Sequence, residues 1–137
     1  MFPRLPTKSF TSDGVSLSYF VRAGPQSNGV PVLLIHGFAS NAATNWVDTG
    51  WVSALSSAGY RVIGFDNRGH GASEKLYKLE DYGAPLMAED ARRLLDHLAI
   101  ERAHVIGYSM GARIAAFLAL AHPDRVQSLV FGGLGIN

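Results

Sequence analysis

The sequence has no cysteine, no dominant charge and no long apolar run. Without cysteine, neither disulfide bonds nor thiolate metal sites can form within its 137 residues. Its 12 basic and 11 acidic residues leave a net charge of +1, far from the strongly basic surface that nucleic-acid binding requires. No run approaches the ~20 apolar residues of a membrane span, and the N-terminal segment lacks the apolar core of a signal peptide. We therefore expect a cytoplasmic protein that binds neither nucleic acid nor membrane.

Apolar residues, in contrast, are abundant. They make up 47% of the sequence, while charged residues make up only 17%. This composition can supply one hydrophobic core, and the length is that of a single domain. There are neither internal repeats nor low-complexity segments. We expect strands and helices to alternate along one continuous unit.

Six strands are expected. Segments 7–12 and 15–22 meet at Asp13-Gly14, a dipeptide that accepts the positive φ of a tight hairpin turn. Four further strands are expected near 31–36, 60–65, 103–108 and 126–132. Unbroken apolar runs of this kind are typical of strands buried on both faces of a parallel sheet.

Helical patterns separate these strands. Thr49 is expected to cap a short helix with Trp51, Val52 and Leu55 on one face, and Gly59 to end it. A third helix, near 110–121, is apolar on nearly all sides and is expected to be the most buried.

The second helix has an apolar stripe with helical spacing. The stripe is formed by Met87, Ala91, Leu94, Leu95 and Leu98. The charged residues expected to face water are Glu89, Asp90, Arg92, Arg93 and Asp96. The alternation predicts an α/β fold with a doubly wound, mostly parallel sheet and an N-terminal antiparallel hairpin. Ligands of such sheets bind outside the carboxyl ends of the strands.

One motif stands at such a strand end. Gly107-Tyr108-Ser109-Met110-Gly111 fits G-x-S-x-G, with an apolar strand before it and an apolar helix after it. A serine on this sharp turn projects its hydroxyl above the sheet, and the helix N-terminus behind it offers free N–H groups to developing negative charge. The alternative is a Gly-Ser turn that merely leads into a core helix.

Two further motifs follow the neighbouring strands. After His36-Gly37, the backbone N–H of Phe38 could act with that of Met110 as an oxyanion hole, although an ordinary turn with a packed histidine is the alternative. Residues 66–73, Asp-Asn-Arg-Gly-His-Gly-Ala-Ser, indicate a tight loop locked by charge-assisted hydrogen bonds. We expect this loop to shape the wall of the site without doing chemistry.

Together the three motifs resemble those of the α/β-hydrolase superfamily, in the same order and setting. The stretch 96–111, DHLAIERAHVIGYSMG, closely resembles the esterase, enol-lactonase and cofactor-free haloperoxidase group. The resemblance implies a Ser/Asp/His hydrolase that acts through an acyl-enzyme, with Ser109 as nucleophile, Gly107 and Gly111 as elbow glycines, and no metal or cofactor. Serine at this position argues against the dehalogenases and epoxide hydrolases of the superfamily, which use aspartate there.

The resemblance also implies that the acid and the histidine follow strands beyond Val130. We therefore expect residues 1–137 to be the N-terminal part of a single domain, inactive alone. The chain's own histidines are poor substitutes: His104 and His122 lie roughly 16–20 Å from Ser109 at strand and helical rise, and His97 is expected to face solvent. Only His36 and His70 stand at carboxyl ends of strands, and each is expected to be a structural wall residue.

The expected partner is a small-molecule acyl substrate, a carboxylic ester, lactone or related compound. One rival is C–C bond hydrolysis or lyase chemistry on carboxylate-bearing substrates, which Arg113 just past the elbow would favour. The other rival is a degenerate, non-catalytic binding module. Strand 126–132 is expected to end the sheet, and its unpaired edge predicts self-association.

Overall fold

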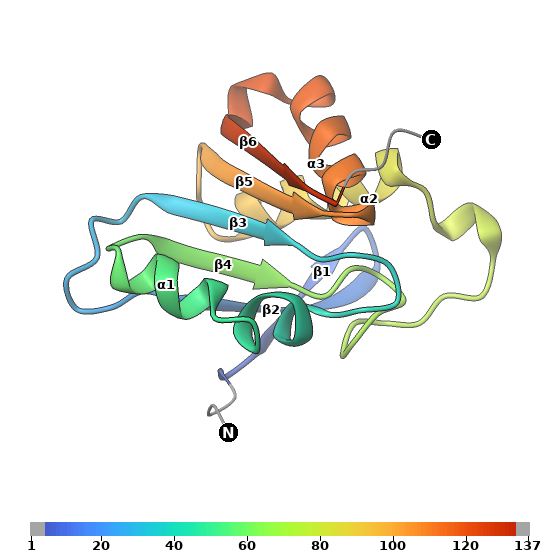
Figure 1. Ribbon diagram of the computed structural model, residues 1–137. Helices are drawn as coiled ribbons and strands as arrows, with labels where there is room; N and C mark the ends of the chain where they lie inside the picture. Colours follow the sequence, from blue (N-terminus) through green and yellow to red (C-terminus); the bar gives the residue numbers. More distant parts are fainter. Residues whose placement is uncertain (1–4, 134–137) are drawn as a thin grey trace.

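The computed structural model describes residues 5–133 and is built around one six-stranded sheet (Figure 1). Residues 1–4 and 134–137 lie outside the described range. The strand order is β1-β2-β4-β3-β5-β6. The strands are β1 (Lys8–Ser12), β2 (Val15–Arg22), β3 (Pro31–Ile35), β4 (Arg61–Phe65), β5 (Ala103–Tyr108) and β6 (Val126–Gly132).

The sheet is antiparallel at one side and parallel over the rest. β1 and β2 form a hairpin, and β2 pairs antiparallel with β4. β4, β3, β5 and β6 are parallel neighbours, so their carboxyl ends meet at one edge of the sheet. The predicted hairpin and the mostly parallel α/β sheet are confirmed.

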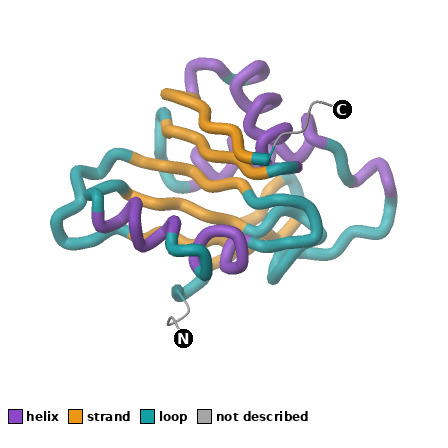
Figure 2. Tube along the Cα trace, viewed as in Figure 1, coloured by secondary structure: helices purple, strands orange, loops and turns teal. Residues whose placement is uncertain are grey.

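The helices cover both faces of the sheet (Figure 2). α2 (Ala84–His97) and α3 (Met110–Ala121) pack on one face, while α1 (Trp51–Ser57) and the π-helical turn η1 (Ala43–Val47) pack on the other. Two 3₁₀ turns complete the set, η2 (Leu79–Asp81) and η3 (Pro123–Arg125). In β3, Leu33 and Ile35 pack in the hydrophobic core beneath α2 and α3. Val32 and Leu34 pack in the core on the other face, with η1 and α1. Burial on both faces explains why this strand is apolar throughout.

Two predictions about α1 are wrong. The residue at its N-cap is Gly50, with φ 90°, and not Thr49. The hydroxyl of Thr49 instead donates a hydrogen bond of 2.6 Å to the backbone oxygen of Asn45, which holds the preceding turn. Trp51 is exposed, packing edge-on against Trp46, so only Val52 of the predicted face is fully buried.

Two predictions about the helices of the other face also fail in part. Asp90 does not face water: it is 1% exposed and lies beneath the loop that follows β4. α3 is buried through Ile114, Ala115 and Leu118 but leaves Leu120 78% exposed. β6 stands at the edge of the sheet, so little chain covers the outer flank of α3 beside it. Among the described residues, no helix is both long and apolar enough to cross a membrane.

Candidate active site

Ser109 stands at the junction of β5 and α3, in a backbone conformation that non-glycine residues rarely adopt. Its φ is 57° and its ψ is −116°, and it occupies the N-cap position of α3. Its backbone N–H donates a 2.8 Å hydrogen bond to the carbonyl of Gly132, so the end of β6 holds the turn in place. Such strain persists only where the surroundings enforce it, and it is concentrated at functional sites.

The two glycines of the motif allow this turn because they have no side chain. A Cβ at Gly107 would overlap the backbone of Gly111, where α3 crosses the end of β5. A Cβ at Gly111 would overlap the backbone oxygens of Ile35 and His36 at the end of β3. The close approach of helix and strand therefore requires glycine at both positions.

The loop after β3 is anchored at Gly37. Its N–H donates to Oδ1 of Asn45 at 2.8 Å, and its carbonyl accepts a 2.7 Å hydrogen bond from Nδ1 of His36. Ala39 has a positive φ of 59°, which turns the chain away from the sheet. Sequence reasoning missed Asn45, because an asparagine in an unpredicted π-helical turn gives no local signal of its long-range partner.

His36 is fully buried and is held in one tautomer. Nδ1 faces the carbonyl of Gly37, which can only accept, so Nδ1 carries the proton. Nε2 then accepts a 2.9 Å hydrogen bond from the backbone N–H of Asn67. Burial lowers the pKa of His36 to about 4, although the Gly37 carbonyl favours the charged ring. His36 therefore joins the loops after β3 and β4, and its lone pair is not available to accept a proton from a serine.

The loop after β4 is locked by charged groups, as the sequence predicted. The carboxylate of Asp66 accepts hydrogen bonds from the backbone N–H groups of Ala42 and Ala72, at 2.8 and 3.0 Å. Arg68 forms two 2.7 Å hydrogen bonds with the buried carboxylate of Asp90. The hydrogen bonds that Arg68 donates to Asp90 raise the pKa of Arg68 above its ordinary value, against the opposing effect of burial.

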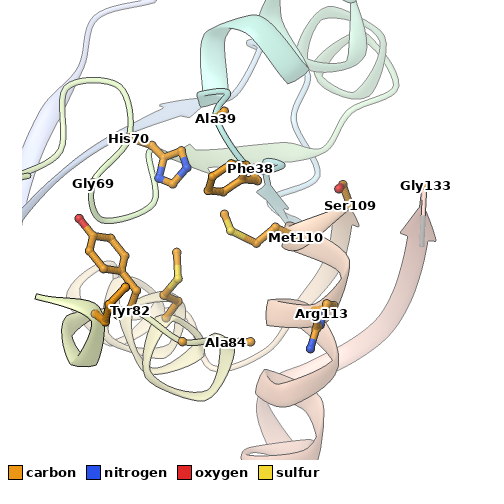
Figure 3. A pocket seen from close by; sticks show the side chains of 13 residues that line it. Phe38, Ala39, Gly69, His70, Tyr82, Ala84, Ser109, Met110, Arg113 and Gly133 are labelled. Carbon is orange, nitrogen blue, oxygen red and sulfur yellow. The ribbon is translucent and has the colours of Figure 1, made fainter. Parts of the chain in front are cut away.

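These loops and the elbow surround an open cleft of about 940 Å³ (Figure 3). The cleft brings together three of the residues that the sequence singled out: Phe38, Ser109 and Met110. Among the rest, the polar side chains belong to His70, Tyr82 and Arg113. The residues that line the cleft are Phe38, Ala39, Gly69, His70, Leu79, Tyr82, Gly83, Ala84, Met87, Ser109, Met110, Arg113 and Gly133.

Both predicted oxyanion donors lie at this cleft. Phe38 is 75% exposed, and Met110 is the first residue of α3, where backbone N–H groups have no partner within the helix. Within residues 5–133 neither N–H donates to another residue. The side chain of Ser109 likewise forms no hydrogen bond with a histidine or carboxylate of the described part.

His104 and His122 have structural partners remote from the cleft. Nδ1 of His104 lies 2.6 Å from the hydroxyl of Ser128, at the opposite end of β5 from Ser109. Nε2 of His122, beyond the far end of α3, lies 2.7 Å from Glu89. Burial raises the pKa of Glu89, but hydrogen bonds from Arg92 and His122 outweigh it, and the pKa falls below its ordinary value. In the part of the chain that the structure describes, no group of three or more acidic or histidine side chains could hold a metal.

Comparisons with known proteins agree with this architecture. A family model described as the alpha/beta hydrolase fold matches residues 30–134. Epoxide hydrolase B of Mycobacterium tuberculosis is 35% identical over 120 residues, which cover 82% of this chain and 32% of that protein. Rhodomycin D methylesterase DauP of Streptomyces sp. (strain C5) is 36% identical over 126 residues, covering 91% of this chain and 41% of that protein.

A third relative and a solved structure complete the comparison. A 2-hydroxy-6-oxononadienedioate/2-hydroxy-6-oxononatrienedioate hydrolase of Paraburkholderia phymatum is 38% identical over 110 residues, covering 76% of this chain and 36% of that protein. The crystal structure of epoxide hydrolase A from Mycobacterium thermoresistibile has a TM-score of 0.82 and 31% identity. It matches 92% of this chain and 38% of that chain.

The chain thus spans between about a third and two fifths of the curated relatives named here, each of which is a hydrolase or an esterase. The family model, in turn, matches well over half of the chain, including all three motifs around the cleft. This chain therefore belongs to the α/β hydrolase fold family.

Proposed function

We propose that Ser109 is the nucleophile of a hydrolase that cleaves a small carboxylic ester, lactone or related acyl bond. The observation that carries this proposal is the conformation of Ser109, strained at the strand-to-helix turn on the wall of the cleft. A buried structural serine has no need of such a turn, whereas a nucleophile gains access to substrate from it.

The reaction follows from the groups around Ser109. Its Oγ attacks the substrate carbonyl and forms an ester bond, while the alcohol leaves with a proton. Water then hydrolyses the acyl-enzyme and restores the serine. The backbone N–H groups of Phe38 and Met110, which have no partner within residues 5–133, stabilise the oxyanion of each tetrahedral intermediate. No metal or organic cofactor has a role in this scheme.

The proposed base comes from outside this chain. His36 has its Nε2 occupied by a backbone N–H, and His104 and His122 have partners remote from the elbow. His70 lines the cleft, but the hydrogen bond of its ring is to the Arg68 carbonyl and not to Ser109. The relatives contain more than twice the matched length, and we propose that equivalent polypeptide supplies the histidine and carboxylate. Without them the serine hydroxyl is a weak nucleophile, so residues 1–137 alone are expected to be nearly inactive.

Ester turnover tests this proposal. Residues 1–137 alone should hydrolyse p-nitrophenyl acetate barely above background, because the oxyanion donors remain but no histidine of the described residues is hydrogen-bonded to Ser109. The proposed polypeptide that carries the histidine and the carboxylate, supplied in cis or as a separate chain, should raise activity by several orders of magnitude. Ser109→Ala should abolish that gain. Ordinary enzymatic turnover by the isolated chain would contradict the missing base, and an inert complemented protein would favour a binding module.

Arg113 favours a second candidate function, C–C bond hydrolysis of a carboxylate-bearing substrate. Arg113 lines the cleft four residues beyond Ser109, and none of the other lining residues is acidic. One relative is named for the hydrolysis of a dioate. Arg113→Gln separates the two candidates: it should weaken the turnover of carboxylate-bearing substrates and leave that of neutral esters unchanged. An equal effect on both classes would count against a carboxylate-binding role.

A further inference from the structure

The ring of His70 is held in one tautomer by the loop after β4. Nδ1 lies 3.0 Å from the backbone oxygen of Arg68. A carbonyl oxygen can only accept, so Nδ1 must carry the proton. In the neutral ring Nε2 then has a lone pair and no hydrogen. That atom can accept a hydrogen bond and cannot donate one.

The carbonyl that fixes this tautomer is itself held in place. The guanidinium of Arg68 binds Asp90 through two 2.7 Å hydrogen bonds and donates a third, of 2.9 Å, to the carbonyl of Asp81. The backbone N–H of His70 donates to Asn67 at 2.9 Å, and its carbonyl accepts from Ser73 at 3.0 Å. The ring is therefore pre-oriented by the hydrogen bonds that hold this loop.

The neighbouring histidine shows what distinguishes His70. The rings of His36 and His70 lie 5.2 Å apart, and both have a protonated Nδ1. Nε2 of His36 is occupied by the Asn67 N–H, whereas Nε2 of His70 has no partner among the described residues. The ring of His70 lies edge-on to Phe38, with centroids 5.8 Å apart, and lines the cleft that contains Ser109 (Figure 3).

We propose that Nε2 of His70 determines specificity by accepting a hydrogen bond from the substrate. The substrate class is then an acyl compound with a hydroxyl or N–H group on the part that lies against Phe38 and His70. This inference rests on the proposed function for its acyl chemistry, but the hydrogen bond itself does not require Ser109 to react. A single hydrogen bond to a partly buried acceptor corresponds to about 3- to 10-fold in affinity.

The tautomer is tested first, on residues 1–137 with ¹⁵N-labelled histidine rings. At pH 8, above the ordinary histidine pKa of about 6.5, two-bond ¹⁵N–¹H spectra show which ring nitrogen carries the proton. The His70 signals, assigned by their loss in His70→Gln, should show a protonated Nδ1 and a bare Nε2. His36 should show the same pattern and serves as an internal reference. A protonated Nε2 on His70 would overturn the inference.

The ligand preference is tested next with ketones that Ser109 cannot hydrolyse. Phenylacetone and its ortho-, meta- and para-hydroxylated derivatives, which are isomers of one another, are titrated into the same sample. At least one isomer should bind about 3- to 10-fold more tightly than phenylacetone and should shift the His70 Nε2 resonance. His70→Phe should remove this advantage, and the matched control His104→Gln, remote from the cleft, should keep it.

The outcomes separate this inference from the proposed function. The preference should persist in Ser109→Ala, because that variant removes the nucleophile and leaves the acceptor. If no isomer is preferred, or if the preference survives in His70→Phe, His70 does not select the substrate. If His70→Phe fails to fold, the titrations of the wild-type protein decide. A His70 Nε2 resonance that none of the hydroxylated isomers shifts would overturn the proposal.

Discussion

Replacing Asp90 by asparagine removes a charge that the fold has buried between β1, α2 and the loop after β4. Its carboxylate accepts hydrogen bonds from the hydroxyl of Ser12 at 2.6 Å and from Nε and Nη2 of Arg68 at 2.7 Å each. The side chains of Asp90 and Arg68 are 1% and 5% exposed. Asp90→Asn keeps the size of the side chain but leaves the guanidinium buried without a counter-charge.

The magnitude follows from that burial. Removing one partner of a buried ion pair typically costs about 3–5 kcal/mol in the free energy of unfolding. Asp96→Asn is a matched control on the same helix, because Asp96 forms 2.6 Å ion pairs with Arg92 and Arg125 at the surface. Exposed pairs contribute about 0–1 kcal/mol.

Urea unfolding at pH 7.5, followed by tryptophan fluorescence, measures both variants. We expect Asp90→Asn to lower the free energy of unfolding several times more than Asp96→Asn. A double replacement, Arg68→Met with Asp90→Leu, should recover part of the loss, because no unpaired charge is then buried. Equal effects of the two single variants would refute the view that the buried pair holds the loop.

Three further outcomes are expected. Gly111→Ala should destabilise by about 3 kcal/mol or more, because its Cβ would overlap the backbone at the end of β3, whereas Gly24→Ala, with only one ordinary contact, should be nearly neutral in thermal unfolding. The pKa of His36 is about 4 in the folded protein and 6.5 ordinarily, so the unfolded chain binds the proton more tightly than the folded protein does. Stability should therefore be complete above pH 6.5 and fall by up to about 3 kcal/mol as the pH drops to 4; His36→Gln should lack this component in urea titrations. Residues 1–137 should self-associate in sedimentation experiments through β6, whose Val130 is 51% exposed, and Val130→Lys should weaken the association, whereas a clean monomer at high concentration would contradict it.

The fold was predictable where one physical cause governs a whole segment. β3 and β4 are interior strands and are buried after their first residue, so burial on both faces produces apolar runs that can be located from the sequence. The elbow was predictable because Gly107 and Gly111 are required by local crossing of helix and strand. Its serine could be named for the same reason, from spacing within five residues.

What the sequence did not predict depends on distant partners. The helical pattern of α2 placed Asp90 with the water-facing residues, but its partners lie 22 and 78 residues away in the chain, on Arg68 and Ser12. Asn45 anchors the loop after β3 from a turn with no recognisable pattern. The exposure of Leu120 follows from the position of β6 at the sheet edge, which the composition of α3 does not encode.

The nucleophilic role of Ser109 is the central claim, and active-site labelling tests it most directly. The chain, together with the proposed polypeptide that carries the histidine and the carboxylate, is treated with a fluorophosphonate probe and analysed by mass spectrometry of its peptides. We expect one covalent adduct, on Ser109, that is absent from Ser109→Ala and retained in the control Ser128→Ala on β6. An unmodified Ser109, or an adduct on another residue that persists in Ser109→Ala, would contradict it.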